Sequence, residues 1–157
     1  MDRLTCVISG SFEKFKPEID NLHSEFQDQG IDVLAPDKGW SGVDYARSKI
    51  IFPQGFRPLP TERGMTPGEI EEEFLRSLAR ASFLYLFNQD GYIGNSAAFE
   101  MGNAIGSNKP IYAHQPLQYE NLDFEDLSHW MLLKNYVRCV PVGEISEDFH
   151  KHLVKAA

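Results

Sequence analysis

The sequence predicts an α/β protein: a doubly wound parallel sheet of five strands, flavodoxin-like or Rossmann-like, with helices on both faces. The first observation is that short apolar runs of strand length alternate with stretches of helical periodicity along the whole chain. The second is that glycine or proline ends several of these stretches, at Gly10, Gly30 and Pro36. Strands that alternate with helices form a mostly parallel sheet, and right-handed crossovers then cover both of its faces.

Five apolar runs are expected to form the strands, because each has strand length and turn residues or a helical stretch beside it. They are LTCVISG at 4–10, IDVLAP at 31–36, FLYLFN at 83–88, KPIYAH at 109–114 and YVRCVPV at 136–142.

Five helices are expected to connect and follow these strands. The first begins at Pro17, since proline suits the first turn of a helix, and it ends at Gly30. The TPGE motif at 66–69 is a capping-box pattern and predicts the start of the second. The others are expected to begin near Asn95 or Ser96, to span about 124–133, and to begin at Ser146.

Length and composition are those of a single globular domain, residues 1–157, with 42% hydrophobic and 24% charged residues. The formal net charge of −8 argues against a protein that coats nucleic acid, because such proteins present a basic surface. A small anionic ligand remains compatible, since local charge can oppose net charge. No apolar run reaches the length of a membrane span, and the first residues lack a signal-peptide pattern.

Both cysteines, Cys6 and Cys139, lie in apolar runs, so we expect buried free thiols in a reducing compartment. The sequence has neither a C-x-x-C pair nor a cluster of histidine and cysteine with ligand spacing. These features predict a cytoplasmic protein with no structural metal and no cofactor.

Residues 37–65 interrupt the alternation and show no clear period, and long connections of this kind are often functional. Residues 37–68 hold five of the twelve glycines and four of the nine prolines, and their cations outnumber their acids. We expect a lid over a binding site, with Trp40 among the aromatic residues that stack on a flat ring and Arg57 among the cations that attract an anion. A surface loop or an oligomer contact is the alternative.

In doubly wound sheets, ligands bind beyond the carboxyl ends of the strands, and this rule selects the candidate site residues. They are Ser9, Gly10, Ser11 and Phe12 after the first strand, Asn88, Asp90, Gly91, Tyr92 and Gly94 after the third, and His114 after the fourth. The helix that begins near Asn95 adds free N–H groups and a positive dipole, which suit a phosphate or a carboxylate.

The sequence SGSF at 9–12 predicts a tight turn and nothing more specific, because it matches neither G-x-G-x-x-G nor a Walker loop. A phospho-acceptor receiver domain would need an acidic pair at this place. A flavodoxin would need a loop rich in hydroxyl groups. Neither alternative is favoured.

Glu100 lies within GYIGNSAAFEMGNA at 91–104 and admits two interpretations. At helical spacing it joins Ser96, Asn103 and Ser107 in one polar stripe, which is typical of a solvent-exposed face. However, the start of its helix borders the expected crevice, so the carboxylate could instead point into the cleft. Gly102 and Gly106 indicate close approach of another segment, because glycine inside a helix costs about 1 kcal/mol relative to alanine.

The combination of GSF, an Asn-Asp-Gly-rich loop, SAAFEMGNA and NKPIY resembles the nucleoside 2-deoxyribosyltransferase-like superfamily. That superfamily also contains nucleotide N-glycosidases, which hydrolyse 5′-monophosphates. The similarity extends from the first strand to about residue 137. The resemblance implies that Glu100 is a nucleophile that forms a covalent glycosyl ester, as in retaining glycosidases. It makes Asp90 the partner carboxylate, which holds a sugar hydroxyl or helps to protonate the departing base.

The resemblance also implies the binding residues. Ser96 and the N–H groups near Asn95 would receive a 5′-hydroxyl or 5′-phosphate, and Phe12 would pack on the base. A neighbouring chain would contribute Asp126, or Asn121, from the segment after the fourth strand. We therefore expect a homo-oligomer, a dimer or larger, with Trp130 and the small-residue face of the Glu100 helix at its interface.

Two departures from the family pattern bear on the activity. Transferases carry an aspartate on the helix before the third strand, and this position falls on Phe74 here, so that either Glu73 substitutes after a small shift or the role is absent. The loop between Asp90 and Glu100 is also longer than in typical transferases. Both departures favour hydrolysis over base exchange at a (deoxy)nucleoside or a nucleoside 5′-monophosphate. The alternatives are a nucleotide-binding module without turnover and a purely structural subunit.

Overall fold

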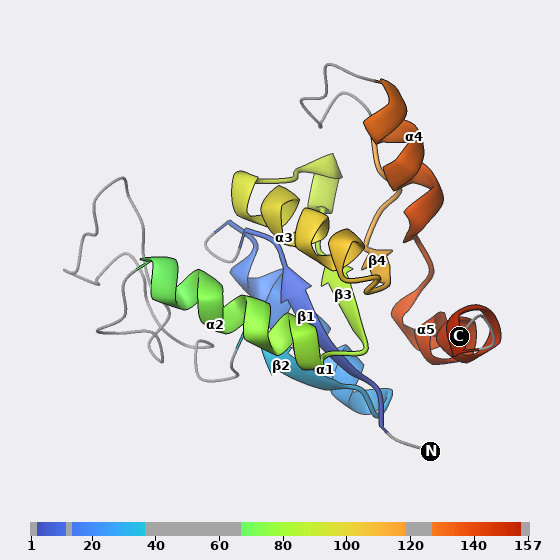
Figure 1. The fold of residues 1–157 in the computed structure, drawn as a ribbon. Helices are drawn as coiled ribbons and strands as arrows, with labels where there is room; N and C mark the ends of the chain where they lie inside the picture. The colour runs from blue at the N-terminus through green and yellow to red at the C-terminus, as the bar shows by residue number, and fades with distance from the viewer. Residues whose placement is uncertain (1–2, 12–13, 37–66, 119–126, 155–157) are drawn as a thin grey trace.

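A parallel sheet of five strands forms the middle layer of the computed structural model, which describes residues 3–11, 14–36, 67–118 and 127–154 (Figure 1). The order of the strands in the sheet is β2-β1-β3-β4-β5. Their bounds are Thr5–Ser9 for β1, Asp32–Ala35 for β2, Phe83–Leu86 for β3, Ile111–Ala113 for β4 and Val137–Arg138 for β5.

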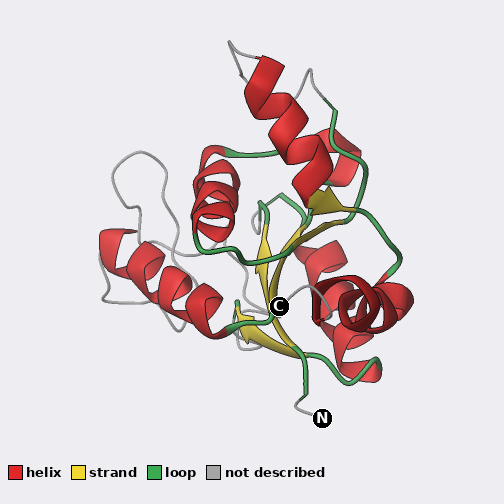
Figure 2. Ribbon diagram, turned by 45° about the vertical axis from the view of Figure 1, so that its right-hand side comes forward, coloured by secondary structure: helices red, strands yellow, loops and turns green. Residues whose placement is uncertain are grey.

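Helices cover both faces of this sheet, as the turned view also shows (Figure 2). The α-helices are α1 at Lys16–Asp28, α2 at Pro67–Arg80, α3 at Asn95–Gly106, α4 at Leu127–Tyr136 and α5 at Val142–Phe149. A 3-10 turn at Gln89–Gly91 follows β3, and a π-helical turn at His150–Val154 follows α5. The predicted doubly wound α/β fold is therefore confirmed.

The last predicted elements have different bounds in the structure. The fifth strand is only Val137–Arg138, not 136–142, and the closing helix begins at Val142, not at Ser146. Pro141 is the N-cap of that helix, and proline has no N–H to donate to a strand ladder. The expectation that both thiols are buried is wrong for the same reason, because Cys139 lies beyond the short strand and is exposed, whereas Cys6 is buried.

Two hydrophobic cores lie on opposite faces of the sheet, because consecutive side chains of a strand point to opposite faces. One core joins Cys6, Ile8, Phe83, Tyr85 and Tyr112 to α1 and α5. The other joins Val7, Leu84, Leu86, Ile111 and Ala113 to α2, α3 and α4. Within the described ranges, no helix combines the length and apolar character that a membrane crossing would need.

The strand order places a topological switch between β1 and β3, where connections leave toward opposite faces. The chain goes from β1 through α1 to β2 at one edge, and then returns through α2 to β3 on the other side of β1. The register pairs Ser9 with Leu86 and Leu86 with Ala113, so these three residues share the face that α2 and α3 cover. Ligand crevices form at such switch points.

Gly10 allows the turn after β1 to pass close to the end of β3. A Cβ atom at Gly10 would lie 3.0 Å from the carbonyl oxygen and 3.2 Å from the Cβ of Phe87. The Phe87 N–H also donates to the Ser9 carbonyl at 2.8 Å, so the two strand ends are held together at this level. The glycine in the tight turn predicted from the sequence is therefore required for packing, since its φ lies outside the left-handed region.

Gly10→Ala is expected to lower the free energy of unfolding by about 1–3 kcal/mol, as overpacking in a well-packed region does. The backbone of Phe87 would have to move by a few tenths of an ångström to admit the methyl group. Gly102→Ala is the matched control, because it adds the same methyl group to an exposed helix position with nothing within 4 Å. Urea unfolding should show a loss for the first variant and no loss for the second, and equal stabilities would contradict the packing argument.

Candidate functional site

Glu100 lies on α3 and is buried against the switch point of the sheet, with only 6% of its surface exposed. The fully buried Ser9, the last residue of β1, donates its hydroxyl to Glu100 Oε1 at 2.6 Å. This contact arises because Ser9 points to the face that α3 covers. A short hydrogen bond to a charged or chargeable oxygen is among the stronger ones in proteins.

The solvent-exposed interpretation of Glu100 is excluded by this burial. Ser96, Asn103 and Ser107 are exposed as the polar stripe predicts, but Glu100 is not. On the helix, Glu100 also neighbours the buried Ala97 and Ala104 at spacings of three and four residues. It therefore stands at the border of the two faces, and its side chain turns toward the sheet.

A second carboxyl group meets Glu100 from α2. The carboxyl group of Glu71 lies within hydrogen-bonding reach of the Glu100 carboxyl group, and each of the two shifts the pKa of the other. Glu71 Oε1 is buried, and no N–H or hydroxyl group in the described part of the chain donates to it. Two ionised carboxylates so close together would repel each other and neither would have a proton to donate, so this proximity favours a proton on one of the pair.

Burial is the main reason that this proton is held. Loss of solvent raises the pKa of Glu100 above its usual range, and the negative charge of Glu71 raises it further. The Ser9 hydroxyl acts in the opposite direction, because it stabilises the carboxylate form. Burial also raises the pKa of Glu71, while its hydrogen bond to Glu100 lowers it. The two carboxyl groups therefore titrate as a unit, and the pair holds a proton above the pH range usual for a carboxyl group.

Glu71 is the site residue that the sequence reasoning missed. The structure brings Glu71, not Glu73, to Glu100, since Glu72 and Glu73 are exposed and pair with Arg76 at 2.8 Å and 3.5 Å. A signal was available in the helical spacing. Glu71 precedes Leu75 by four residues and the buried Leu78 by seven, so it belongs to the inward stripe of α2.

Asp90 lies in the 3-10 turn that leads from β3 to α3 and is exposed. Its φ of 56° places it in the left-handed region, and Gly91 follows with a φ of 79°. Such conformations are uncommon outside glycine, although Asp tolerates them better than most residues. The structure thus presents the Asp90 carboxylate on a tight turn beside the amino end of α3.

The amino end of α3 offers backbone N–H groups without a capping side chain among the described residues. Gly94 is the N-cap, the exposed Asn95 and Ser96 follow, and the first turn carries no acidic residue. The Tyr92 side chain lies beside Gly94, because a Cβ there would be 3.6 Å from its hydroxyl oxygen. Lys14 Nζ stands 4.1 Å from the centre of the Tyr92 ring. This end of the helix is therefore electropositive, and an anion would be favoured there.

His114 and Asn88 make their contacts away from the Glu100 carboxylate. His114 lies on the opposite face of the sheet. Its ring packs on that of Phe87 with 4.6 Å between the ring centroids, and its Nδ1 lies 3.4 Å from the Tyr85 hydroxyl oxygen. Asn88 is fully buried and binds the backbone of Gln115.

The remaining predicted residues divide into two groups. The Ser11 hydroxyl accepts the Lys14 N–H at 3.4 Å within the turn after β1. Phe12, Trp40, Arg57, Asn121 and Asp126, together with the predicted lid at 37–65, lie outside the described residues. Within the described ranges, no group of three or more His, Cys, Asp or Glu side chains could hold a metal.

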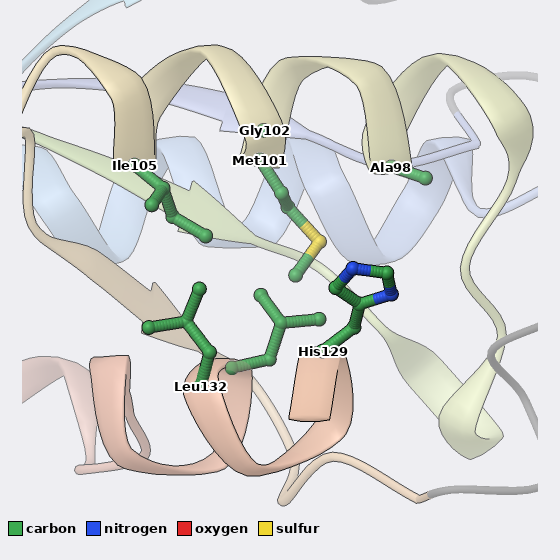
Figure 3. Close-up of a pocket in the computed structure, with 7 residues that line it drawn as sticks. Ala98, Met101, Gly102, Ile105, His129 and Leu132 are labelled. Carbon is green, nitrogen blue, oxygen red and sulfur yellow. The ribbon is translucent and has the colours of Figure 1, made fainter. Parts of the chain in front are cut away.

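An apolar groove with a volume of about 360 Å³ lies between α3 and α4 (Figure 3). Met101 and Ile105 point into it from α3, and His129 and Leu132 enter from α4. Its lining is almost free of polar surface, and it does not include Glu100. The groove is thus separate from the carboxyl pair, and His129 is the one polar side chain among the residues that line it.

Comparisons with known proteins establish the fold. No family model and no curated protein matches this chain. The CMP N-glycosidase BcmB of Clostridium botulinum matches in structure with a TM-score of 0.52 and 14% identity, over 95% of this chain and 99% of that one. A conserved protein from Enterococcus faecalis V583 matches with a TM-score of 0.54 and 13% identity, over 97% and 100%. The shared fold agrees with the resemblance seen in the sequence.

Glu100→Gln is expected to raise stability at neutral and alkaline pH. Burial raises the folded-state pKa of Glu100 above its ordinary value of 4.5, so protonation favours the folded state. That contribution is complete below the unfolded pKa and is lost as the pH rises through the folded pKa. Glutamine stays neutral and avoids this loss, which is about 1.4 kcal/mol for each unit of pKa shift.

Urea unfolding at about pH 5 and about pH 8 measures this difference, because linkage makes stability depend on pH only where the two states bind protons differently. The advantage of Glu100→Gln should widen at the higher pH. Glu147→Gln, at an exposed position of α5, is the control and should show no such widening. A variant whose advantage is the same at both pH values would show that Glu100 does not hold its proton.

Proposed function

We propose that this chain cleaves the N-glycosidic bond of a nucleoside or nucleoside 5′-monophosphate, as a member of the nucleoside 2-deoxyribosyltransferase-like superfamily. One observation carries the proposal: the buried Glu100 and the half-buried Glu71 bring two carboxyl groups together at the switch point of the sheet, where desolvation raises the pKa of both. One ionised and one protonated carboxyl group are what displacement at a sugar carbon requires.

The first half of the reaction forms a glycosyl ester on Glu100. When substrate is bound, the shared proton resides on Glu71, and the Glu100 carboxylate attacks the anomeric carbon. The bond between that carbon and the base nitrogen breaks, and its electron pair leaves with the base. The base takes up the proton from Glu71. In this one step Glu71 acts as the acid and Glu100 as the nucleophile.

The second half restores the pair. Water attacks the same anomeric carbon and breaks its bond to the Glu100 oxygen, while Glu71, now ionised, accepts a proton from the water. The sugar leaves with a hydroxyl group in place of the base, and the net configuration is retained because two inversions have occurred. A second base in place of water would give transfer.

Ser9 assists by holding the nucleophile. Its hydroxyl donates to Glu100 Oε1, which fixes one oxygen and stabilises the carboxylate form that must attack. Pre-organisation of this kind lowers the barrier because the attacking group loses little freedom in the reaction.

The substrate is oriented by the edge of the sheet. A 5′-hydroxyl or 5′-phosphate is received at the amino end of α3, near Asn95 and Ser96, and Asp90 holds a sugar hydroxyl. Lys14 adds positive charge beside this place and favours a 5′-phosphate over a free hydroxyl. The likeness to a CMP N-glycosidase makes pyrimidine 5′-monophosphates the first substrates to examine.

A nucleotide-binding module without turnover is the second candidate. The observation that favours it is the raised pKa of Glu100, because a carboxyl group that keeps its proton is no nucleophile. In that case the same pocket binds the ligand, and Glu71 and Glu100 act as hydrogen-bonding groups only.

Release of free base from nucleosides and 5′-monophosphates tests the proposal. Chromatography should show free base with the wild-type chain, and Glu100→Gln should reduce the rate by about a thousandfold or more, as loss of a nucleophile does. Glu71→Gln should lower the rate less steeply, by about a hundredfold, because it removes an acid and not the nucleophile.

Controls separate the two candidates. Glu72→Gln changes an exposed neighbour on the same helix and should keep the wild-type rate. Binding of a nucleotide without any base release would support the binding module and overturn the enzyme. Equal release by Glu100→Gln would remove Glu100 from the nucleophile role, and exchange with an added base would identify a transferase.

The same chain is proposed to act as a homo-oligomer through the face formed by α3 and α4. Phe99, Met131 and Leu132 are large apolar side chains with more than half of their surface exposed, at 60%, 56% and 54%. Leu132 lines the apolar groove, and Phe99 and Met131 lie on the same two helices. Apolar surface of this kind is typical of association sites.

Leu132→Glu is expected to convert this oligomer into monomers, because a charge would have to be buried at the interface. Sedimentation velocity of the purified chain measures the change. Lys134→Glu, an exposed change on the same helix, is the control and should leave the assembly intact. A wild-type chain that sediments as a monomer would refute the oligomer.

A further inference from the structure

Asn88 joins two chain segments at the edge of the sheet where the proposed site lies. It lies two residues after the end of β3 and is 0% exposed. Its Nδ2 donates to the Gln115 carbonyl at 2.8 Å, and its Oδ1 accepts the Gln115 N–H at 2.8 Å. One amide side chain therefore satisfies both backbone groups of a residue that lies two positions after β4.

This pair of bonds continues the ladder after the strand has ended. The last backbone bond between β3 and β4 runs from the His114 N–H to the Leu86 carbonyl at 2.9 Å. At Asn88 the backbone has left the strand conformation, with φ −107° and ψ 55°. The side chain takes over the pairing that the backbone can no longer make, so the main chain is free to turn.

The main-chain turn that follows Asn88 carries Asp90. The Asn88 carbonyl accepts the Gly91 N–H at 2.9 Å, which closes the 3-10 turn around Asp90. Phe87, one residue earlier, is packed against Gly10 of the turn after β1. The exits of β1, β3 and β4 are thus held to one another at the residues just before Asp90.

We propose that Asn88 is a positioning residue for the reaction at Glu100, because its amide fastens the Asp90 turn to the segment after β4. The role rests on the proposed function, in which Asp90 holds the sugar. Asn88 itself touches no substrate, since both of its polar atoms are used inside the protein. This assignment replaces the substrate contact expected from its position in the sequence.

The pairing needs a donor and an acceptor side by side in one plane, which a primary amide provides. An ionised aspartate has the same shape but offers two acceptors, so one of its oxygens would face the Gln115 carbonyl. A protonated aspartate has a donor again and restores the match. In Asn88→Asp, the contact with the Gln115 backbone therefore depends on pH. Burial raises the pKa of the introduced carboxyl group toward neutral pH.

The experiment compares base release by Asn88→Asp and by the wild-type chain over a range of pH. At alkaline pH the variant should lose roughly tenfold or more in kcat, since misplacement of a reacting group by about 1 Å is costly. The ratio of variant to wild-type kcat should rise toward one as the pH falls. Asn21→Asp, the same change at an exposed position of α1, should follow the wild-type chain at every pH.

Amide hydrogen exchange tests the contact between residue 88 and Gln115 independently of catalysis. Exchange of the Gly91 and Gln115 amide protons should be faster in Asn88→Asp at alkaline pH and should return to the wild-type rate in acid, each compared with the wild-type chain at the same pH. Wild-type kcat in Asn88→Asp at alkaline pH, or a loss that acid does not reverse, would overturn the positioning role. Unchanged amide exchange would overturn it too. Absence of base release from the wild-type chain would instead refute the proposed function.

Discussion

The parallel pairing of β1 with β3 is the constraint on which the candidate site depends. Four residues of β1 pair with four of β3, from Cys6 opposite Phe83 to Ser9 opposite Leu86. Because β2 lies on the other side of β1, the connections on either side of this pair leave toward opposite faces. A shift of one residue in this register would turn Ser9 to the opposite face and remove its hydroxyl from Glu100. The geometry of the candidate site therefore depends on the strand register more directly than on any loop.

Burial of the Glu100 carboxyl group beside Glu71 opposes stability, and under the proposed function it serves chemistry at the same place. A carboxyl group without solvent keeps its proton, and a neighbouring carboxyl group strengthens that tendency. The protein offsets part of this cost with the Ser9 hydroxyl, which favours the charged form. Strained or costly groups of this kind are concentrated at functional sites, where a stable fold tolerates them for the sake of reactivity. Under the proposed function, the burial of Glu100 beside the half-buried Glu71 is understandable as a reactive feature.

The edge of the sheet is organised by side chains as much as by backbone. Gly10 permits close approach to Phe87, and Asn88 extends the β3–β4 ladder by one further pairing. On the opposite face, His114 packs on Phe87 and belongs to the α1 and α5 side. The two faces are therefore divided between different tasks. One face carries the carboxyl pair, and on the other face aromatic side chains pack against the ends of the strands.

The sequence by itself determined the fold class and the edge of the sheet at which the proposed site lies. Alternating runs identified all five strands, and the rule about carboxyl ends selected Ser9, Asp90 and the start of the Glu100 helix. These features depend on local periodicity and topology, which the residue order contains. The partner of Glu100 was decided only by the tertiary structure. Glu71 and Glu73 lie on one helix and differ in orientation by about 200°, so their roles depend on how α2 rotates against the sheet. Likewise, the burial of Glu100 and the inward turn of Asn88 follow from contacts with residues far away in the chain, which periodicity does not record.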